Sequence, residues 1–300
     1  MTTLPSGLRM LSATATLVLA VVACGPPEER SAPPRAADVA DDPWTEVVET
    51  ERAFAAAARE GSRKGAFLRF IDSAGVLFRP GPVEGRPALE AGPECPGLLE
   101  WTPAVAAVSD DGELGFTTGP WILTVGDDVG TGRYTTLWRR TVEGEYRFVL
   151  DVGVVGPGPA VLPTDAPVRR ARVGSPEPGA GSRTLMAADS AVRAGYTEGA
   201  PALAGLAFPS WLQVLRPGRE PESGPAPFLA EVVGAADRGG VDWEVAGSGA
   251  SPDGSLGYVY GMASWASGTD VPAAPFLRIW AREDDGDWQL LLDLLGLPDA

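Results

Sequence analysis

The sequence contains no histidine and no asparagine, a single lysine, Lys64, and two cysteines, Cys24 and Cys95. The missing histidines exclude Ser-His-Asp and Cys-His nucleophile systems, histidine general bases and histidine-based zinc sites. Two cysteines are too few for a thiolate metal site. Any catalysis must therefore use Asp, Glu, Tyr, Arg or Lys64, and we expect no metal and no cofactor.

Basic residues are also scarce, because 24 Lys and Arg stand against 40 Asp and Glu, which gives a net charge of −16 at pH 7. Such an acidic chain repels phosphate backbones and anionic headgroups, so nucleic acid is not an expected partner. The acidic clusters at residues 110–113, 126–128 and 283–287 lack the 12-residue calcium loop with its terminal Glu. We interpret them as hairpin turns.

The N-terminus has the pattern of a bacterial lipoprotein signal. Residues 11–23 form an apolar run too short to span a bilayer comfortably, and the small residues before Cys24 resemble a lipobox. We expect residues 1–23 to be a signal peptide, Cys24 to carry the lipid, and residues 24–43 to form a Pro-rich tether. An ordinary secretory signal is the alternative.

This pattern also predicts the location of the protein. We expect the bacterial cell envelope, at the outer membrane if the organism has one, with the lipid as the only contact with the membrane. With Cys24 lipidated, Cys95 has no partner for an intramolecular disulfide.

One sequence pattern occurs twice in the chain. Trp101 and Trp243 are 142 residues apart. The same offset relates DGELGF to DGSLGY, Gly119 to Gly261, Trp138 to Trp280, Gly144 to Gly286 and Asp151 to Asp293. Collinear matches at constant spacing indicate a tandem duplication.

Each copy reads as helices followed by strands. Residues 44–60 are Ala-rich with apolar residues at helical spacing, a second short helix follows, and Pro87 opens a third. Four strand-like runs come next, joined by the turn sequences DDG, GDDVGTG and VEG, which are typical of antiparallel hairpins. We therefore predict α+β domains at residues 44–153 and 184–296, joined by a Pro- and Gly-rich linker at 154–183.

The order αα-β-α-ββββ, together with particular motifs, resembles the nuclear transport factor 2-like superfamily and its association-domain-like branch. The motifs are Glu51-x-x-Phe54 in the first helix, VLFRPG at a strand end, and GRYTTLWRR followed by YRFVLDVG. The resemblance implies tandem cone-shaped domains with curved antiparallel sheets, the fold also found in ketosteroid isomerase and polyketide cyclases. In the second copy PFLR replaces RYTT. Because the superfamily includes enzymes, binders and dimerisation modules, the resemblance implies a fold more than an activity.

The strands are apolar on both faces, and both faces must therefore be buried. In the superfamily, the sheet surface outside the cone commonly packs against a second copy. We expect the two copies to pack in this way as an intramolecular pseudo-dimer, and the chain to be a monomer.

Strict strand alternation places Asp151 and Asp293 on the face opposite Phe148 and its neighbours, outside the cones. We expect each Asp to be structural and to pair with a nearby arginine, such as Arg140 or Arg282. A catalytic base is the alternative.

Large aromatic residues and arginines are the candidate ligand contacts near the mouths of the cones. Trp and Tyr provide apolar walls with one polar group, and an Arg can orient a carboxylate or enolate oxygen. The alternative is that the aromatics fill the core and the arginines pair with local acids. The candidates are Arg79, Trp101, Trp121 and Tyr134 in the first copy, with Arg216, Trp243, Trp265 and Phe276 as counterparts in the second.

Three functions stay open: a tethered module that binds a small, largely apolar ligand, an interaction scaffold, and an isomerase, cyclase or dehydratase with a buried Asp or Glu as general base. Superfamily mechanisms that use His or Asn are excluded. The acids of the first helices are Glu46, Glu49 and Glu51 in copy one and Asp189 in copy two. A pocket with a carboxylate away from any arginine would favour the enzyme.

Overall fold

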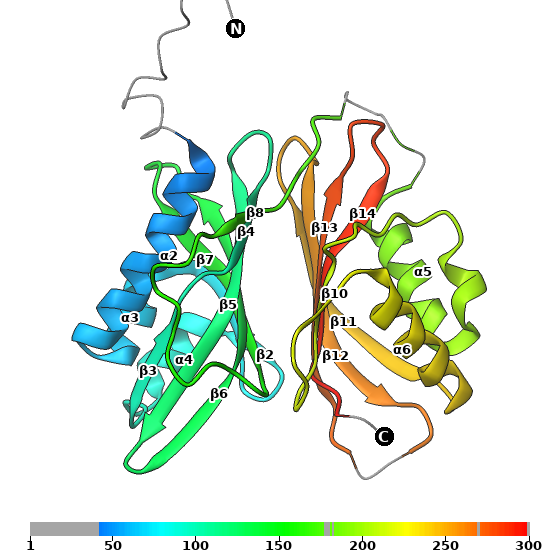
Figure 1. The fold of residues 1–300 in the computed structure, drawn as a ribbon. Coiled ribbons are helices and arrows are strands. Elements are labelled where there is room, and N and C mark those ends of the chain that lie inside the picture. Colours follow the sequence, from blue (N-terminus) through cyan, green and yellow to red (C-terminus); the bar gives the residue numbers. More distant parts are fainter. Residues whose placement is uncertain (1–41, 177–180, 182, 269–270, 299–300) are drawn as a thin grey trace, which may run out of the picture. The chain divides into compact units, whose positions relative to one another are not determined.

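A computed structural model describes residues 42–176, 181, 183–268 and 271–298 (Figure 1). The expected signal peptide, Cys24 and nearly all of the tether lie outside these residues. Within the described ranges, no helix is both long enough and apolar enough to cross a membrane.

The first repeat begins with helices and continues into an eight-stranded sheet of order β2-β1-β7-β6-β5-β4-β8, in which β3 also pairs with β5. Its helices are α2 (Pro43–Glu60), α3 (Arg63–Phe70) and α4 (Gly85–Ala91). Its strands are β1 (Ile71–Phe78), β2 (Pro82–Glu84), β3 (Leu98–Trp101), β4 (Val105–Val108), β5 (Leu114–Val125), β6 (Asp128–Arg140), β7 (Tyr146–Val155) and β8 (Arg169–Arg170).

The second repeat has a six-stranded sheet of the equivalent order β10-β9-β14-β13-β12-β11. Its helices are α5 (Leu185–Glu198), the 3₁₀ turn η1 (Ala200–Leu203) and α6 (Pro225–Asp237). Its strands are β9 (Gln213–Leu215), β10 (Glu222–Ser223), β11 (Val241–Ala250), β12 (Leu256–Trp265), β13 (Ala274–Arg282) and β14 (Trp288–Leu295). The two strand orders confirm the α+β class, and in each repeat two helical segments, two paired strands and a further helix precede the main antiparallel strands.

Local sequence explains how the first helices start and which face they bury. Pro43 occupies the first turn of α2, where a missing N–H costs nothing, and Val47, Glu51 and Phe54 lie on its buried side. Ser62 caps α3 by accepting a hydrogen bond from the backbone N–H of Gly65 at 2.9 Å.

Two differences from the predicted elements have simple causes. The single strand expected before the DDG turn is divided into β3 and β4, because Pro103 between them has no N–H to donate to a neighbouring strand. The predicted linker contributes a strand of its own, since β8 adds to β4 in parallel.

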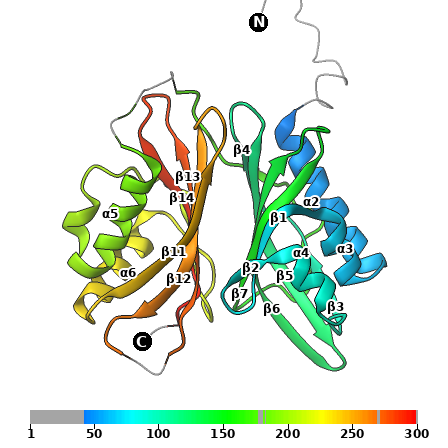
Figure 2. The same ribbon diagram turned by 180° about the vertical axis from the view of Figure 1, so that it is seen from behind.

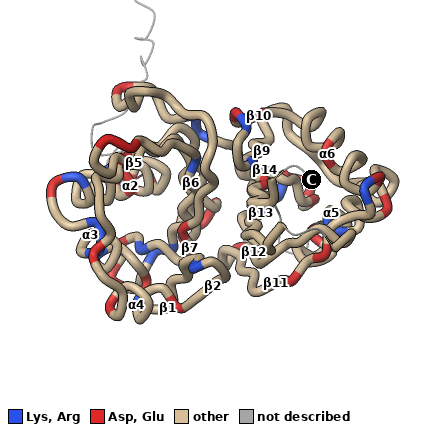
Figure 3. Tube along the Cα trace, turned by 90° about the horizontal axis from the view of Figure 1, so that it is seen from below, with Lys and Arg blue, Asp and Glu red and all other residues tan. Residues whose placement is uncertain are grey.

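The outer faces of the two sheets pack against each other. Helices α2, α3 and α4 lie on the far side of the first sheet, and α5 and α6 on the far side of the second (Figures 1, 2 and 3). One apolar cluster contains Leu137 and Leu150 of the first repeat with Leu277 and Leu292 of the second. The expected intramolecular pseudo-dimer is therefore confirmed as an arrangement of the two repeats.

Equivalent residues meet at one end of this contact. The backbone N–H of Asp111 donates to the carboxylate of Asp253 at 2.9 Å, and the N–H of Asp253 donates to the carboxylate of Asp111 at 2.9 Å. Reciprocal bonds between equivalent residues are the mark of a twofold relation. The acidic turn that contains Asp111 thus has a structural role.

The last strand of each repeat contains a β-bulge. In β7, Phe148 and Leu150 pair with successive residues of β6, so Val149 is an extra residue. In β14, Leu291 is extra in the same way against β13. An extra residue shifts the alternation of every later side chain by one position.

The bulges change the position of the two aspartates. Tyr146 and Phe148 pack in the cone of the first repeat, whereas Leu150 packs between the repeats, so Asp151 points into the cone. Asp293 points into the second cone for the same reason. The prediction that both lie outside the cones is wrong.

Candidate functional site

A cavity of about 890 Å³ lies between the helices and the inner face of the sheet of the first repeat, and Pro275 of the second repeat also contributes to its wall. Its wall is largely apolar, with a few polar side chains, which is the usual make-up of a small-molecule site. The lining residues are Phe54, Arg63, Lys64, Phe67, Leu77, Phe78, Arg79, Pro80, Ala88, Leu89, Gly92, Pro93, Cys95, Leu99, Trp101, Trp121, Leu123, Tyr134, Asp151, Val152, Gly153 and Pro275.

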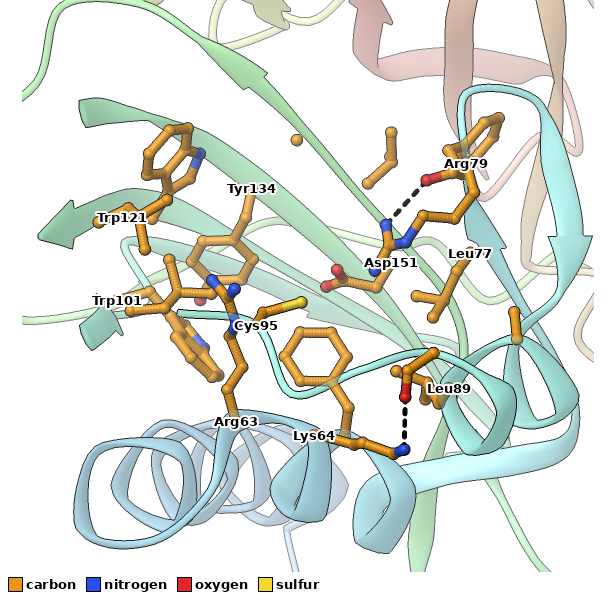
Figure 4. Close-up of a pocket in the computed structure, with 18 of the residues that line it drawn as sticks. Arg63, Lys64, Leu77, Arg79, Leu89, Cys95, Trp101, Trp121, Tyr134 and Asp151 are labelled. Atoms are coloured by element: carbon orange, nitrogen blue, oxygen red, sulfur yellow. Dashed lines mark hydrogen bonds between the residues drawn. The ribbon is translucent and has the colours of Figure 1, made fainter. Parts of the chain in front are cut away.

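All four candidate residues of the first repeat line this cavity. Trp101 and Trp121 lie on one side of it, Arg79 lies on the other, and Tyr134 is on the sheet between them (Figure 4). The two tryptophans are direct neighbours in the β3–β5 pairing. Arg79 and Tyr134 are the two candidates farthest apart in the chain, separated by 55 positions, and the fold brings them to the same cavity.

Asp151 also lines the cavity, although the sequence analysis placed it elsewhere. Its carboxylate accepts a hydrogen bond from the Thr136 hydroxyl at 2.8 Å and is in no ion pair within the described ranges. Burial raises the pKa of Asp151 to about 6, against the Thr136 hydrogen bond and the charge of Arg79, which lower it. The expected partner Arg140 instead pairs with Glu46 at 2.7 Å.

Glu51 of α2 is a second acid inside the same cone and is fully buried. Its carboxylate accepts hydrogen bonds from Trp101 Nε1 at 2.5 Å, from Trp138 Nε1 at 3.2 Å and from the Thr117 hydroxyl. Burial raises the pKa of Glu51 to about 7 despite these donors, and the charge of Asp151 adds to the rise.

The Tyr134 hydroxyl is a buried donor that has no hydrogen-bond partner among the described residues. Its side chain is 6% exposed and lines the cavity. Burial, with the nearby charges of Glu51 and Asp151, raises the pKa of Tyr134 well above its usual range. The hydroxyl is therefore neutral.

Three cations lie in the wall of the cavity: Arg63 and Lys64 of α3 and Arg79 after β1. Their hydrogen bonds go to backbone carbonyls: Arg63 to Pro96 at 3.5 Å, Lys64 to Gly92 at 2.6 Å and Arg79 to Phe78 at 2.8 Å. Across the described part of the chain, none of the three is in an ion pair.

In the second repeat, the residues at the positions of Thr136 and Asp151 form ion pairs. Arg278, at the position of Thr136, is fully buried; its Nε donates to Asp293 at 2.7 Å and its Nη1 to Asp189 at 3.1 Å. Its guanidinium also lies over the Trp243 ring, 4.3 Å from the ring centre. A side chain of the protein itself thus occupies the space between the two acids.

Arg216, the counterpart of Arg79, completes this network. Its Nη2 contacts Asp293 at 2.5 Å, and its Nε donates to both oxygens of Glu231 at 2.7 and 2.8 Å. Although burial acts to raise the pKa of Asp293, the charges of Arg216 and Arg278 hold it below its usual range. Asp293 is paired with arginines, as expected, but Arg282 is not one of them.

Two further assignments of the sequence analysis change with the structure. Trp243 pairs with Ala263 in the β11–β12 register, as Trp101 pairs with Trp121, so Ala263 and not Trp265 is the counterpart of Trp121. Trp265 packs in the second core and donates to the Pro298 carbonyl at 3.3 Å.

The remaining candidate acids lie away from the cavity wall. Glu49 pairs with Arg52 on the exposed side of α2 at 2.7 Å. Among the residues that the structure describes, no group of three or more carboxylates and cysteines is placed to hold a metal ion.

No protein-family model matches the sequence, and the search of curated proteins gave no match. Solved structures align with parts of the chain. An NTF-2-like protein of unknown function from Shewanella oneidensis is 14% identical, with 36% of this chain and 95% of that chain covered and a TM-score of 0.30. A protein from Catenulispora acidiphila is 18% identical, with 40% and 92% covered and a TM-score of 0.30. A protein of unknown function from Mycobacterium tuberculosis is 12% identical, with 65% and 94% covered and a TM-score of 0.28.

Proposed function

We propose that the first repeat binds one small, largely apolar molecule in its cavity, while the second repeat supports it as a structural partner. The observation that carries this proposal is the contrast between the cones. The first holds a cavity of about 890 Å³, and in the second Arg278 fills the space between the two acids.

A neutral fluorescent probe tests the binding. N-phenyl-1-naphthylamine is expected to bind the protein with a rise in fluorescence, because its aromatic body matches an apolar wall that contains Trp101 and Trp121. The Ala88→Trp variant puts an indole into the cavity wall and is expected to weaken binding at least about tenfold. Val233→Trp, at an exposed position of α6, is the matched control.

Cys95 reports where the probe sits. It is exposed, lines the cavity, and is the only cysteine after Cys24. Saturation with the probe is expected to slow alkylation of Cys95 by iodoacetamide. An unchanged alkylation rate at saturation would place the probe elsewhere and contradict the proposal.

A second candidate function is proton transfer, with Asp151 as the general base. Three observations favour it: the carboxyl lines an apolar cavity, it is in no ion pair with the residues that the structure describes, and its pKa is raised to about 6.

Ring opening of 5-nitrobenzisoxazole tests this second function, because the reaction needs only a base. The carboxylate takes the ring proton, the C–H electrons form the nitrile, and the N–O bond breaks to release a phenolate. Wild type is expected to catalyse it with a rate that rises through about pH 6, and Asp151→Asn is expected to lose about 100-fold or more. Equal rates in the two proteins would exclude Asp151 as the base.

We propose further that a lipid on Cys24 holds the protein at the bacterial cell envelope. The support is the lipobox-like sequence before Cys24 and the Pro-rich segment after it. Mass spectrometry of the N-terminal peptide from cells is expected to show a diacylglyceryl group on Cys24. A free thiol there would contradict this assignment.

A further inference from the structure

The two repeats share an arginine at the same place, and it has different partners in each. In the second repeat Arg216 holds two carboxylates at once, Glu231 through Nε and Asp293 through Nη2. In the first repeat Arg79 is exposed, and its hydrogen bond goes to the Phe78 carbonyl. Among the residues that the structure describes, Arg79 therefore has no carboxylate in the place that Glu231 occupies beside Arg216.

The sequence explains why that carboxylate is missing. Leu77 pairs with Val83 in the first repeat as Val214 pairs with Glu222 in the second. Continued without a gap, this register places Gly92, the residue directly after α4, at the position of Glu231 in α6. Gly92 has no side chain and lines the cavity, so the first repeat has no carboxylate at this position.

The remaining polar groups of the wall also favour an acceptor. Arg63 and Lys64 bring two more cations to the cavity. Among the described residues of the wall, Asp151 is the one carboxylate. Donors and positive charge thus exceed acceptors and negative charge, in a protein whose net charge is −16.

We propose that the natural ligand of the cavity is an apolar molecule with a carboxylate, and that this carboxylate binds Arg79 in the place that Glu231 occupies beside Arg216. This inference rests on the proposed binding function. Arg216 shows that an arginine at this position can contact Asp293 and a second carboxylate together. Arg278 adds positive charge beside Asp293 in the second repeat, and Arg63 and Lys64 add it to the wall of the first cavity.

Three probes with one alkyl body and different head groups test the proposal: decanoate, 1-decanol and decylammonium. Each is titrated at about pH 8 against bound N-phenyl-1-naphthylamine. Decanoate is expected to displace the dye at a concentration about tenfold lower than decanol, because a charge-assisted hydrogen bond to arginine strengthens its binding. Decylammonium is expected to be the weakest.

Two variants locate the effect. Arg79→Gln is expected to remove the advantage of decanoate over decanol. Gly92→Glu supplies the carboxylate from the protein and is expected to remove the same advantage. Arg59→Gln is the control, since Arg59 lies on α2, pairs with Glu60 and is not in the cavity wall.

The outcomes separate this inference from the function on which it rests. If decanol and decanoate bind equally and Arg79→Gln changes neither, the cavity binds apolar molecules but the carboxylate assignment is wrong. Preference for decylammonium would also overturn the assignment. Failure of the dye and of every probe to bind would overturn both proposals.

Discussion

Asp151 and Asp293 occupy the same position in the two repeats and have different partners. Asp293 contacts Arg216 and Arg278, whereas Asp151 accepts one hydrogen bond from Thr136. Thr136 stands where the second repeat has Arg278. The Asp151 carboxyl is therefore available to a ligand, whereas the Asp293 carboxyl is held in an ion-pair network. Burial acts on both aspartates, and the arginines decide the direction of the pKa shift.

The raised pKa of Asp151 gives a pH-dependent stability. Between about pH 4 and pH 6 the folded protein keeps a proton that the unfolded chain has released, so this group makes the protein less stable as the pH rises through that window. Asp151→Asn is expected to be more stable than wild type by about 1–3 kcal/mol at pH 8, and equal to it near pH 4.

Urea unfolding at the two pH values measures this difference. Asp127→Asn, in the exposed turn between β5 and β6, is the control and is expected to change little. If Asp151→Asn is less stable than wild type at pH 8, the Asp151 carboxylate stabilises the fold, which would contradict the raised pKa of Asp151.

Arg278 is expected to be essential for the stability of the second repeat. Arg278→Thr, which copies the first repeat, leaves Asp189 and Asp293 buried with one arginine fewer each. The free energy of unfolding is expected to fall by about 3–5 kcal/mol. Chemical denaturation measures the loss, with the exposed Arg52→Thr as control, and a loss no larger than that of the control would contradict the role given to Arg278.

At the scale of elements, the helices, the hairpins and the duplication follow from local patterns in the sequence. Capping residues, apolar spacing and turn sequences act within a few residues, so they can be recognised without the tertiary structure. The aromatic and arginine residues of the first cavity were also predictable, because polar-tipped aromatics near strand ends are typical of such walls.

The β-bulges were the main obstacle to predicting the site. Strict alternation along β7 places Asp151 outside the cone, and one extra residue, Val149, reverses the alternation before Asp151. A signal was present: two consecutive apolar residues, Val149 and Leu150, interrupt the pattern. The cations Arg63 and Lys64 were missed for another reason, since only the tertiary fold brings α3 to the cavity that Arg79 lines.

Deletion of Val149 tests the assignment of the bulge. Leu150 would then follow Phe148 directly and keep its pairing with Leu137, so Leu150, Val152 and Val154 would stay on the face toward the second repeat. We expect the variant to fold, as judged by near-ultraviolet circular dichroism, with a loss of stability of no more than about 1.5–3 kcal/mol for the one buried side chain removed. Loss of the folded signal would contradict the assignment of Val149 as the extra residue.

At the scale of the whole molecule, the two repeats share one apolar cluster between their sheets. Leu137 and Leu150 on one side pack with Leu277 and Ile279 on the other, and each of these residues is fully buried. A chain that supplies both halves of this contact needs no second copy to cover either sheet, and we therefore propose that it is a monomer.

The shared cluster predicts that the repeats unfold together. Loss of either repeat would expose the apolar outer face of the other, so a single cooperative transition is expected in calorimetry and in tryptophan fluorescence. Two separate transitions would show that each repeat is stable alone and would contradict this prediction.

We propose that one cone of the duplicated fold is open to a ligand and that the other is filled by the protein itself. Native mass spectrometry of residues 25–300 with N-phenyl-1-naphthylamine tests this, because it counts bound molecules per chain. One bound molecule per monomer is expected for wild type at saturation, with a smaller bound fraction for the Ala88→Trp variant at the same probe concentration. Two molecules per chain, or none in wild type, would contradict the proposal.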